Sequence, residues 1–430
     1  MSFEIIMAIS FALLVILLVT GAPFYVAFLA GSIPFLLFVA EVPGISLGAL
    51  AKEAVNSFTL IAIPLFIFLG SIMGEIGATA DLFRLASAFL GHIKGGLGMA
   101  TIIACTLFGA MCGSGLATAM AIGAIAIPEL TKKGYDRGTI GAICGTAGGL
   151  GLIIPPSIGY IILADVLGCS VGQLFIAGIV PGILACVMLC IACYIYCRPR
   201  KEIQVSNKYT WKERGKATVG ALPPMVIPAA IMGSIYGGIA TPTEAAGVAC
   251  FVSLLLGLFY YRTLNMDIVW KTLKGTVKTT SAVWCIIVGA VVFGKVLAFE
   301  SIPQAGGELI ASLQLSEMGF IFAFLGLFFI LGMFFDAFIL VLACLPPLIG
   351  AITSCNINLI YFGILFQFMV IVGQCTPPVG ITLYTAGMAS GATTGEVIKA
   401  APIFVAALCV TVIILIFLMP VLPQAIMPLK

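Results

Sequence analysis

The sequence predicts an all-α polytopic membrane protein built from two inverted repeats, and three observations lead to this fold class. The chain of 430 residues is 62% hydrophobic and only 9% charged, with a mean hydropathy of +1.23. Apolar segments of membrane-spanning length recur along it, which is not typical of a soluble protein with one large core. Two unusual interruptions in the first half return in the second half at a constant offset.

The two interruptions lie within residues 108–157. Residues 112–118 read CGSGLAT, and residues 148–157 read GGLGLIIPPS. Unpaired backbone groups in hydrocarbon cost several kcal/mol each, so irregular chain at membrane depth persists only inside protein or beside a watery cavity. For either break alone, glycines that allow close helix packing and a proline kink are an equally good explanation.

The recurrence of both breaks favours a functional site. A shift of 222 residues places Ser114 on Asp336 and Pro155-Pro156 on Pro377-Pro378. Two breaks in the same order and at one offset indicate a duplicated chain. Paired interruptions by glycine and proline, at corresponding positions of two halves, are typical of the binding site of a secondary transporter.

The first repeat, residues 1–197, contains one segment that is too long for a single crossing. Residues 95–130 have Ser114 near their middle and basic residues on both flanks, which favours a re-entrant hairpin. We expect these elements in order: frame helices within 3–40 (3–20 and 22–40), a helix at 55–76, a polar amphipathic stretch at 79–94, the hairpin at 95–130, a broken helix at 139–167 and a helix at 171–197.

A basic linker, residues 198–218, separates the repeats and is expected in the cytoplasm by the positive-inside rule. Each repeat makes five crossings and one hairpin, so the second repeat is inverted and the two hairpins enter from opposite sides. In the second repeat, residues 219–430, we expect frame helices within 221–261 (221–240 and 243–261), a basic cytoplasmic loop at 262–278, a helix at 279–299, a counterpart of the amphipathic stretch at 299–312, a hairpin at 315–350, a broken helix at 358–389 and a helix at 397–420.

Several motifs resemble the large membrane subunit of tripartite ATP-independent periplasmic (TRAP) transporters. The resemblance covers essentially the whole chain. Its motifs are Gly91-His92 with Gly95-Gly96-Leu97, Gly113-Ser114 with Ala117-Thr118, Gly134-Tyr135-Asp136, Ile154-Pro155-Pro156-Ser157, Thr241-Pro242-Thr243-Glu244-Ala245 and Thr376-Pro377-Pro378-Val379-Gly380.

The resemblance implies Na⁺-driven uptake of an organic acid across the bacterial inner membrane, with sialic acid and C4-dicarboxylates as candidate substrates. It also implies two partners: a soluble periplasmic binding protein that delivers the substrate, and a small four-helix membrane subunit. Because no such four-helix region precedes Phe3, we expect the small subunit to be a separate protein. The family is similar in its hairpins to ion transporters whose substrate domain moves as an elevator.

In that wider group, hairpin tips and broken helices hold Na⁺. Na⁺ is a hard cation that prefers oxygen ligands, and the C-termini of broken helices supply such ligands as backbone carbonyls. We therefore expect about two ions, one between each tip and the break of the same repeat. The predicted Na⁺ ligands are Gly113, Ser114, Thr118, Gly149, Gly151 and Ser157 at the first site, and Gly332, Asp336, Gly373, Thr376 and Gly380 at the second. The predicted substrate contacts are the hydroxyls of Ser114, Thr118, Ser157 and Thr376.

Asp336 is the most informative of these residues, because an ionisable group within the membrane is functional by default. A tip carboxylate that faces water is the alternative. Cys112 stands where the family usually has serine, and a thiol is a poor ligand for a hard cation, so only its carbonyl is a candidate ligand. All six arginines lie in loops or at helix ends, which leaves no guanidinium clamp near the breaks. Lys295 is expected to snorkel or to pair with Glu300.

Other classes of protein fit less well. An intramembrane enzyme needs a nucleophile and a base, yet the only histidine, His92, lies in a basic loop. A nucleic-acid-binding protein does not fit this composition. A channel needs a continuous polar path, which opposed hairpins do not provide, and a symporter that works without a binding protein remains open. Among the fourteen cysteines, four share one helix face, where small packing residues are expected: Cys186, Cys190, Cys193 and Cys197.

An elevator carries its ions only if each tip moves together with its break. Residues 95–167 and 315–388 are then one moving body, and the helices near 3–40 and 221–261 are the fixed frame. The stretch 79–94 becomes an arm along the membrane surface that joins the two, with Gly91 and Gly95 as candidate hinges.

Overall fold

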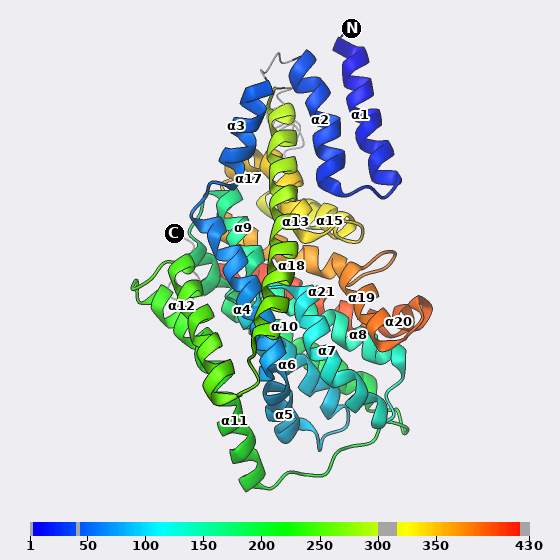
Figure 1. The fold of residues 1–430 in the computed structure, drawn as a ribbon. Coiled ribbons are helices and arrows are strands. Elements are labelled where there is room, and N and C mark those ends of the chain that lie inside the picture. The colour runs from blue at the N-terminus through cyan, green and yellow to red at the C-terminus, as the bar shows by residue number, and fades with distance from the viewer. Residues whose placement is uncertain (1–2, 40–43, 300–315, 422–430) are drawn as a thin grey trace.

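A computed structural model describes residues 3–39, 44–299 and 316–421, and the regular structure in these ranges is entirely helical (Figure 1). The predicted all-α class is confirmed. The first half holds α1 (Phe3–Val19), α2 (Phe24–Phe38), α3 (Gly44–Val55), α4 (Ala62–Ile76), α5 (Ala78–Leu90), α6 (Gly96–Cys112), α7 (Gly115–Lys132), α8 (Arg137–Gly149), α9 (Ile158–Leu167) and α10 (Val171–Cys197). The second half holds α11 (Trp211–Tyr236), α12 (Pro242–Leu255), α13 (Met266–Phe299), α15 (Glu317–Gly332), α16 (Ala337–Ile339), α17 (Ile349–Ser354), α18 (Leu359–Gln374), α19 (Ile381–Ser390), α20 (Thr394–Ala400) and α21 (Pro402–Leu418).

Six helical segments within the described residues are long and apolar enough to cross a membrane, and they make the chain a multi-pass membrane protein. These segments are Thr59–Ile76, Val171–Cys197, Trp211–Tyr236, Pro242–Tyr260, Met266–Leu297 and Pro402–Val421. A bent pair, Ala337–Cys344 and Pro346–Ser354, is a seventh candidate. Among the shorter apolar helices, α6 ends at the first predicted tip and α9 begins directly after the first predicted break.

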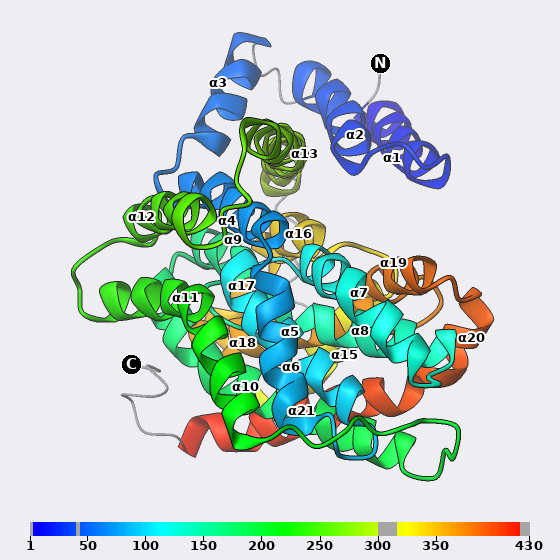
Figure 2. The ribbon, with the colours of Figure 1, turned by 60° about the horizontal axis from the view of Figure 1, so that its bottom comes forward.

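The helices pack into two groups (Figure 2). In the first group, which we name the core bundle (α6–α10 and α15–α21), α8 packs against α19, and α10 packs against α18 and α21, so the two halves interlock. In the second group, which we name the outer helices (α1–α4 and α11–α13), α13 packs against α2, α3 and α4. The helix α5 lies between the groups and packs against both α6 and α11.

The helix pattern repeats at the offset seen in the sequence. The helix α8 begins at Arg137 and α18 at Leu359, 222 residues later, and both proline pairs are in the cis form. The same offset maps α3 and α4 together onto the single long helix α13, because Gly44 corresponds to Met266. The helix α3 itself was not predicted, since its segment contains the charged pair Lys52-Glu53 and is too polar to count as a span.

The prediction of a loop at 262–278 is wrong for most of its length, because α13 already begins at Met266, whereas its cytoplasmic location stays a prediction. The side chain of Asn265 accepts a hydrogen bond of 2.8 Å from the amide of Ile268, which is how an asparagine cap starts a helix. Lysine and threonine lower the hydropathy of this segment without preventing a helix, so a search for apolar spans does not detect it.

The two hairpins differ in regularity. In the first, α6 and α7 are continuous and pack against each other. In the second, the returning arm bends by 47° before Pro346, since proline lacks the amide that a helix needs. The predicted surface stretch at 299–312 and the partner proposed for Lys295, Glu300, lie outside the described residues, apart from Phe299 at the end of α13.

Candidate functional site

The tip of the first hairpin is bonded to the break in the next broken helix. The helix α6 ends at Cys112, Gly113 adopts a left-handed conformation with a φ of 63°, and Ser114 caps α7. The carbonyl of Gly113 accepts a hydrogen bond of 3.2 Å from the amide of Ile158, the first residue of α9. A Cβ on Gly113 would lie 2.9 Å from that nitrogen, so the junction requires glycine for its space as well as its conformation.

Glycines bring the first tip and the first break into backbone contact. A Cβ added to Gly151 would lie 2.5 Å from Oγ1 of Thr118 and 2.9 Å from the carbonyl oxygen of Ser114. A Cβ on Gly115 would lie 3.4 Å from the Cα of Gly149. The structure thus brings five predicted ligands of the first ion together: Gly113, Ser114, Thr118, Gly149 and Gly151.

The sixth predicted ligand, Ser157, is fully buried inside the break. Its hydroxyl donates a hydrogen bond of 2.7 Å to the carbonyl of Leu152 and accepts one of 3.4 Å from the amide of Tyr160. It therefore already caps α9. The thiol of Cys112 lies within the tip, with its Sγ 3.4 Å from Oγ1 of Thr118.

The second tip and break repeat this arrangement. A Cβ on Gly373 would lie 2.7 Å from the Cα of Gly332, so α15 and α18 touch backbone to backbone. The amide of Gly380 donates a hydrogen bond of 3.2 Å to the carbonyl of Met333. Gly380 corresponds to Ile158 by the repeat offset, and both amides bond the nearby hairpin tip. The predicted ligands Gly332, Gly373 and Gly380 therefore meet, as their counterparts do in the first half.

Asp336 is a half-buried carboxylate that caps α16. One oxygen accepts a hydrogen bond of 2.9 Å from the amide of Phe338, and the other accepts one of 3.4 Å from Nε2 of Gln374. The side-chain carbonyl oxygen of Gln374 is buried and has no hydrogen-bond partner among the described residues. A buried acceptor beside a carboxylate is a suitable oxygen ligand for a hard cation.

Gln374 was not among the predicted site residues, although it lies only two residues before the predicted ligand Thr376. Its signal was a glutamine at the last position of a largely apolar helix segment, directly before the break. The hydroxyl of Thr376 donates a hydrogen bond of 2.6 Å to the carbonyl of Val372, which leaves its lone pairs available to a ligand.

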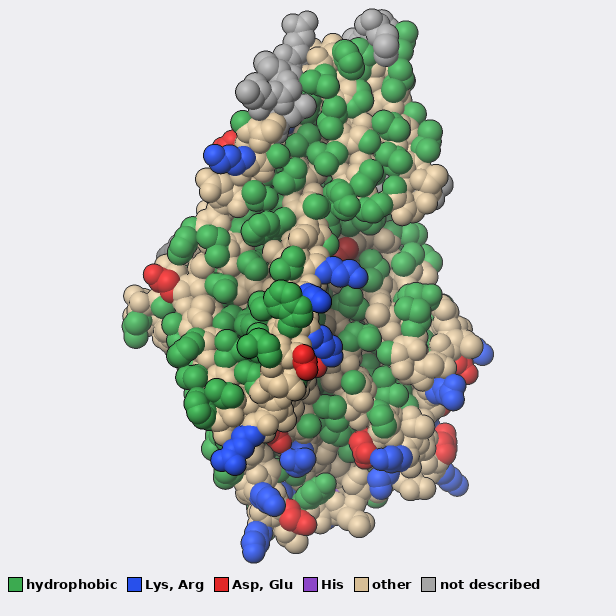
Figure 3. Space-filling model, viewed as in Figure 1, with side chains coloured by type: hydrophobic (Ala, Val, Ile, Leu, Met, Phe, Trp, Pro, Cys, Tyr) green, Lys and Arg blue, Asp and Glu red, His purple; other side chains and the backbone are tan. Residues whose placement is uncertain are grey.

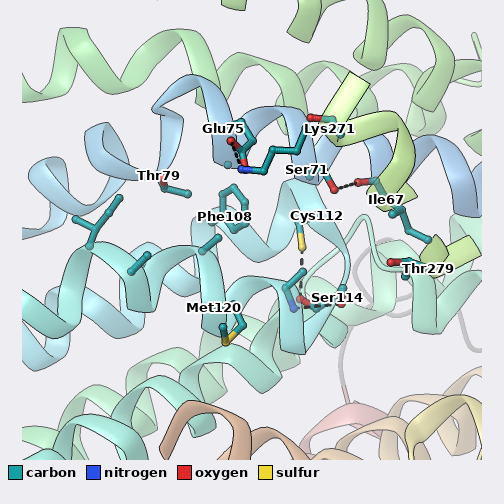
Figure 4. A pocket seen from close by; sticks show the side chains of 18 residues that line it. Ile67, Ser71, Glu75, Thr79, Phe108, Cys112, Ser114, Met120, Lys271 and Thr279 are labelled. Carbon is teal, nitrogen blue, oxygen red and sulfur yellow. Dashed lines mark hydrogen bonds and ion pairs between the residues drawn. The ribbon is translucent and has the colours of Figure 1, made fainter. Parts of the chain in front are cut away.

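A cavity of about 540 Å³ opens between the first hairpin and the outer helices α4 and α13 (Figure 4). Of the four predicted substrate contacts, Ser114 lines it, whereas Thr118 and Ser157 are fully buried in the packed junction behind the tip. Thr376 belongs to the second junction and is not on the cavity wall. Hydroxyls of Ser71 and Thr279, from α4 and α13, also line the cavity.

Two charged side chains line this cavity within the described residues, and neither is an arginine. Lys271 of α13 forms an ion pair with Glu75 of α4, with Nζ 2.8 Å from one carboxylate oxygen and 3.0 Å from the other. The sequence analysis did not identify either residue, because it assigned Lys271 to a loop.

The cysteine face of α10 packs against α6, as predicted. The Sγ of Cys193 lies 3.7 Å from the carbonyl of Gly95, and a Cβ on Gly98 would lie 2.6 Å from that sulfur. No cluster of three or more metal-binding side chains occurs in the described parts of the chain.

The described parts of the chain are helical, include six or more helices that can span a membrane, and join hairpin tips to broken helices. These features define the class of protein as a multi-pass membrane transporter. Residues 11–421 match the family model of the tripartite ATP-independent periplasmic transporter, DctM component, and the chain belongs to this family.

Relatives support this membership. The chain is 33% identical to the ectoine/5-hydroxyectoine TRAP transporter large permease protein UehC of Ruegeria pomeroyi, over 95% of each chain. It is 36% identical to the ectoine TRAP transporter large permease protein TeaC of Halomonas elongata, over 83% of this chain and 84% of the relative. It is 35% identical to the C4-dicarboxylate TRAP transporter large permease protein DctM of Pseudomonas aeruginosa, over 91% of each. These relatives are transporter permeases and not enzymes.

A solved structure shares the fold. The YdaH transporter of Alcanivorax borkumensis superposes with a TM-score of 0.61, covering 87% of this chain and 89% of its own, at 13% sequence identity. At this identity the likeness concerns the fold alone.

Proposed function

We propose that this chain is the membrane-spanning permease of a Na⁺-coupled uptake system for an organic acid in the bacterial inner membrane. A periplasmic binding protein delivers the substrate, and a small membrane subunit completes the system. The observation that carries the proposal is the pair of tip–break junctions, in one of which Asp336 accepts a hydrogen bond from the amide of Gln374, whose side-chain oxygen has no partner among the described residues. Family membership supports the same function.

Each junction supplies oxygen ligands for one Na⁺ from two separate segments. At the first, the ion is held by carbonyls and hydroxyls around Gly113, Ser114, Thr118 and Gly151. At the second, it is held by Asp336, by Gln374 and by the carbonyls near Gly332 and Gly373. Bound Na⁺ places positive charge next to the cavity, where Ser114 contributes a hydroxyl to the carboxylate of the substrate.

Two ions provide enough free energy for uptake. At about 100 mV, one charge contributes roughly 2.3 kcal/mol, and a tenfold Na⁺ gradient adds about 1.4 kcal/mol. Two ions therefore supply roughly 7.4 kcal/mol, while one monoanion costs about 2.3 kcal/mol to carry inward. The remaining 5 kcal/mol or so corresponds to an accumulation of three to four decades.

The substrate is an organic acid, with sialic acid or a C4-dicarboxylate as the first candidates. The names of relatives also include ectoine and isethionate. Within this range the transported compounds share an acid group, which agrees with a site built from hydroxyls, backbone amides and bound Na⁺.

Transport proceeds by an elevator movement of the core bundle against the outer helices. The interlocking of both halves in the core bundle supports this proposal, because it keeps the two ion sites in one body. The helix α5 acts as the arm between the two groups, and Gly95, left-handed with a φ of 77°, is the better hinge candidate because Gly91 is helical with a φ of −56°.

The test is uptake into proteoliposomes that contain this chain and the small subunit. We expect accumulation of a labelled acid only with an inward Na⁺ gradient and the loaded binding protein. Uptake that needs Na⁺ but no binding protein would identify a simple symporter instead. Passive flux without either requirement would identify a channel, and both results would overturn the proposal.

A further inference from the structure

The N-terminal half of α13, one of the membrane-spanning set, carries several charged and polar side chains. Its lysines, Lys271, Lys274 and Lys278, are spaced i, i+3 and i+7, so they project from one helix face, and all three are exposed. We name them the lysine row. Figure 3 shows a row of basic side chains over α13, with an acidic side chain at its lower end. At 1.5 Å per residue, the row extends about 10 Å along the helix.

The lysine row reaches the cavity that contains Ser114 at one of its members, Lys271. Lys271 and Thr279, two turns apart on α13, both line this cavity. In Figure 4, the pair of Lys271 and Glu75 and the hydroxyl of Ser114 lie on opposite sides of the cavity. A solute that leaves Ser114 along α13 therefore passes Lys271, the cavity-lining member of the lysine row.

The ion pair of Lys271 is suited to exchange. The Lys271 side chain is 69% exposed and that of Glu75 is 36% exposed. Exposed ion pairs of this kind contribute little to stability, because water and salt screen them. A carboxylate that enters the cavity can therefore replace Glu75 as the partner of Lys271. With Lys271, Lys274 and Lys278 against Glu75 and Asp267, the N-terminal half of α13 and its partner on α4 carry one excess positive charge.

Buried hydroxyls mark the opposite face of the same helix segment. Thr276 and Thr280 are buried, and neither hydroxyl has a hydrogen-bond partner among the described residues. A helix that only anchors the protein in lipid has little use for polar groups on two faces. Snorkelling lysines at a lipid boundary are the plain alternative, but Lys271 lines a cavity and forms an ion pair with Glu75, which lines the same cavity.

We propose that the lysine row is an anion-binding surface along which the acid group of the substrate passes between Ser114 and the cytoplasm. The inference rests on the proposed function. Lys271 exchanges Glu75 for the carboxylate of the substrate, and Lys274 and Lys278 guide the anion along α13. A positive surface beside a low-dielectric cavity raises the local concentration of anions and their rates of arrival.

The first test measures the electrostatics of the cavity without transport. The variant Thr279→Cys (T279C) is placed in phosphatidylcholine nanodiscs at low ionic strength. Its thiol is then modified by one of two methanethiosulfonate reagents of similar size, an anionic one that carries a sulfonate or a cationic one that carries a trimethylammonium group. Mass spectrometry of the peptide that contains residue 279 gives each rate, normalised to the exposed reporter Gly395→Cys on α20, which has both Glu396 and Lys399 nearby in sequence. We expect the anionic reagent to react about tenfold faster, and added salt to remove the preference.

Variants assign the preference to the row. The triple variant K271Q/K274Q/K278Q should bring the ratio of rates close to one, whereas the matched triple K201Q/K208Q/K212Q in and beside the linker should leave it unchanged. Glu75→Gln should raise the ratio, since it frees Lys271. A ratio near one in the parent T279C chain, or one that the row triple does not change, would overturn the proposal.

Two further arms separate the substrate path from other roles. If the preference disappears when phosphatidylglycerol is added to the nanodiscs, lipid headgroups occupy the row and the proposal is wrong.

The second arm measures exchange in proteoliposomes, with labelled sialic acid, succinate or ectoine, whichever compound the wild-type system carries. The row triple should slow exchange of that compound about tenfold and leave the Na⁺ half-saturation unchanged, and unaltered exchange would contradict the proposal. Absence of wild-type uptake counts against the proposed function alone, and the reagent test still decides the lysine row.

Discussion

The amide of Ile158 donates a hydrogen bond of 3.2 Å to the carbonyl of Gly113, which ties the start of α9 to the tip of the first hairpin. The amide of Gly380 makes the same connection to Met333 in the second half, also at 3.2 Å. An ion held between tip and break takes its ligands from two segments about 40 residues apart in sequence, and these bonds hold the segments in register.

The glycine contacts at the first junction predict a sharp effect of one methyl group. Gly151→Ala places a Cβ 2.5 Å from Oγ1 of Thr118, so the tip must move, at a cost of about 1–3 kcal/mol. We expect at least a tenfold loss of uptake and a lower melting temperature. Gly326→Ala in α15, where nothing lies within 4 Å, is the control and should leave both unchanged. Equal behaviour of the two variants would show that the junction tolerates separation.

The two ion sites should differ in their dependence on charge. Asp336→Asn removes a carboxylate charge, whereas Ser114→Ala removes one hydroxyl, and a hard cation loses more from the first change. We expect Asp336→Asn to raise the Na⁺ concentration for half-maximal uptake by about tenfold, which corresponds to about 1.4 kcal/mol. Ser114→Ala should raise it less. An unchanged Na⁺ dependence in Asp336→Asn would mean that the carboxylate is only a solvated tip.

Gln374 provides a second test of the same site. Gln374→Leu removes the buried oxygen that has no partner in the structure and keeps much of the side-chain volume. If that oxygen binds Na⁺, the half-maximal Na⁺ concentration rises several-fold while the maximal rate at high Na⁺ is recovered. Gln367→Leu, at another buried glutamine of α18 with an unpaired amide, is the matched control and should not change the Na⁺ dependence. A similar Na⁺ response of both variants would argue against a ligand role for Gln374.

The elevator movement predicts a cross-link that depends on state. A Cβ on Gly74 of α4 would lie 3.9 Å from the Cβ of Ala121 of α7, which is close to the spacing of a disulfide. In a background without native thiols, Gly74→Cys with Ala121→Cys should link efficiently in the state described here. When Na⁺ and loaded binding protein are added, the yield should fall and partners further along α7 should replace Ala121.

A control pair within the core bundle checks this reading. A Cβ on Gly387 would lie 3.8 Å from the Cβ of Val397, and both residues belong to the bundle that is proposed to move as one body. Gly387→Cys with Val397→Cys should link equally in all conditions. Cross-links between α4 and α7 that stay at one depth in every condition would rule out the elevator.

The basic linker predicts the orientation of the whole chain. A reporter that is active only in the periplasm, fused after Lys208, should be silent because the surrounding arginines and lysines retain the linker in the cytoplasm. The same reporter fused after Asn356, in the uncharged turn of the second half, should be active. Activity at Lys208 would overturn the predicted inversion of the two repeats.

Much of the fold was predictable because it depends on patterns that are local in sequence. Apolar length marks most of the crossings, glycine and proline mark the tips and breaks, and a constant offset between Ser114 and Asp336 marks the duplication. The start of the helix at Met266 was missed because its lysines and threonines lower the hydropathy. Its cap, Asn265, lies one residue before the helix and is not part of the apolar pattern. The predicted hairpin at 315–350 contains the returning arm, but not the bend in it, because that bend depends on Pro346 within an otherwise apolar run.

By itself, the sequence determined the membrane class, the two broken segments and the residue types that can hold a hard cation. Only the tertiary structure decided which of these residues meet, because contacts such as Gly151 with Thr118 and Asp336 with Gln374 join segments whose spacing along the chain carries no distance information. The same holds for the cavity: Lys271 and Glu75 lie 196 residues apart, and only the packing of α13 against α4 brings them together on the side of the cavity opposite Ser114.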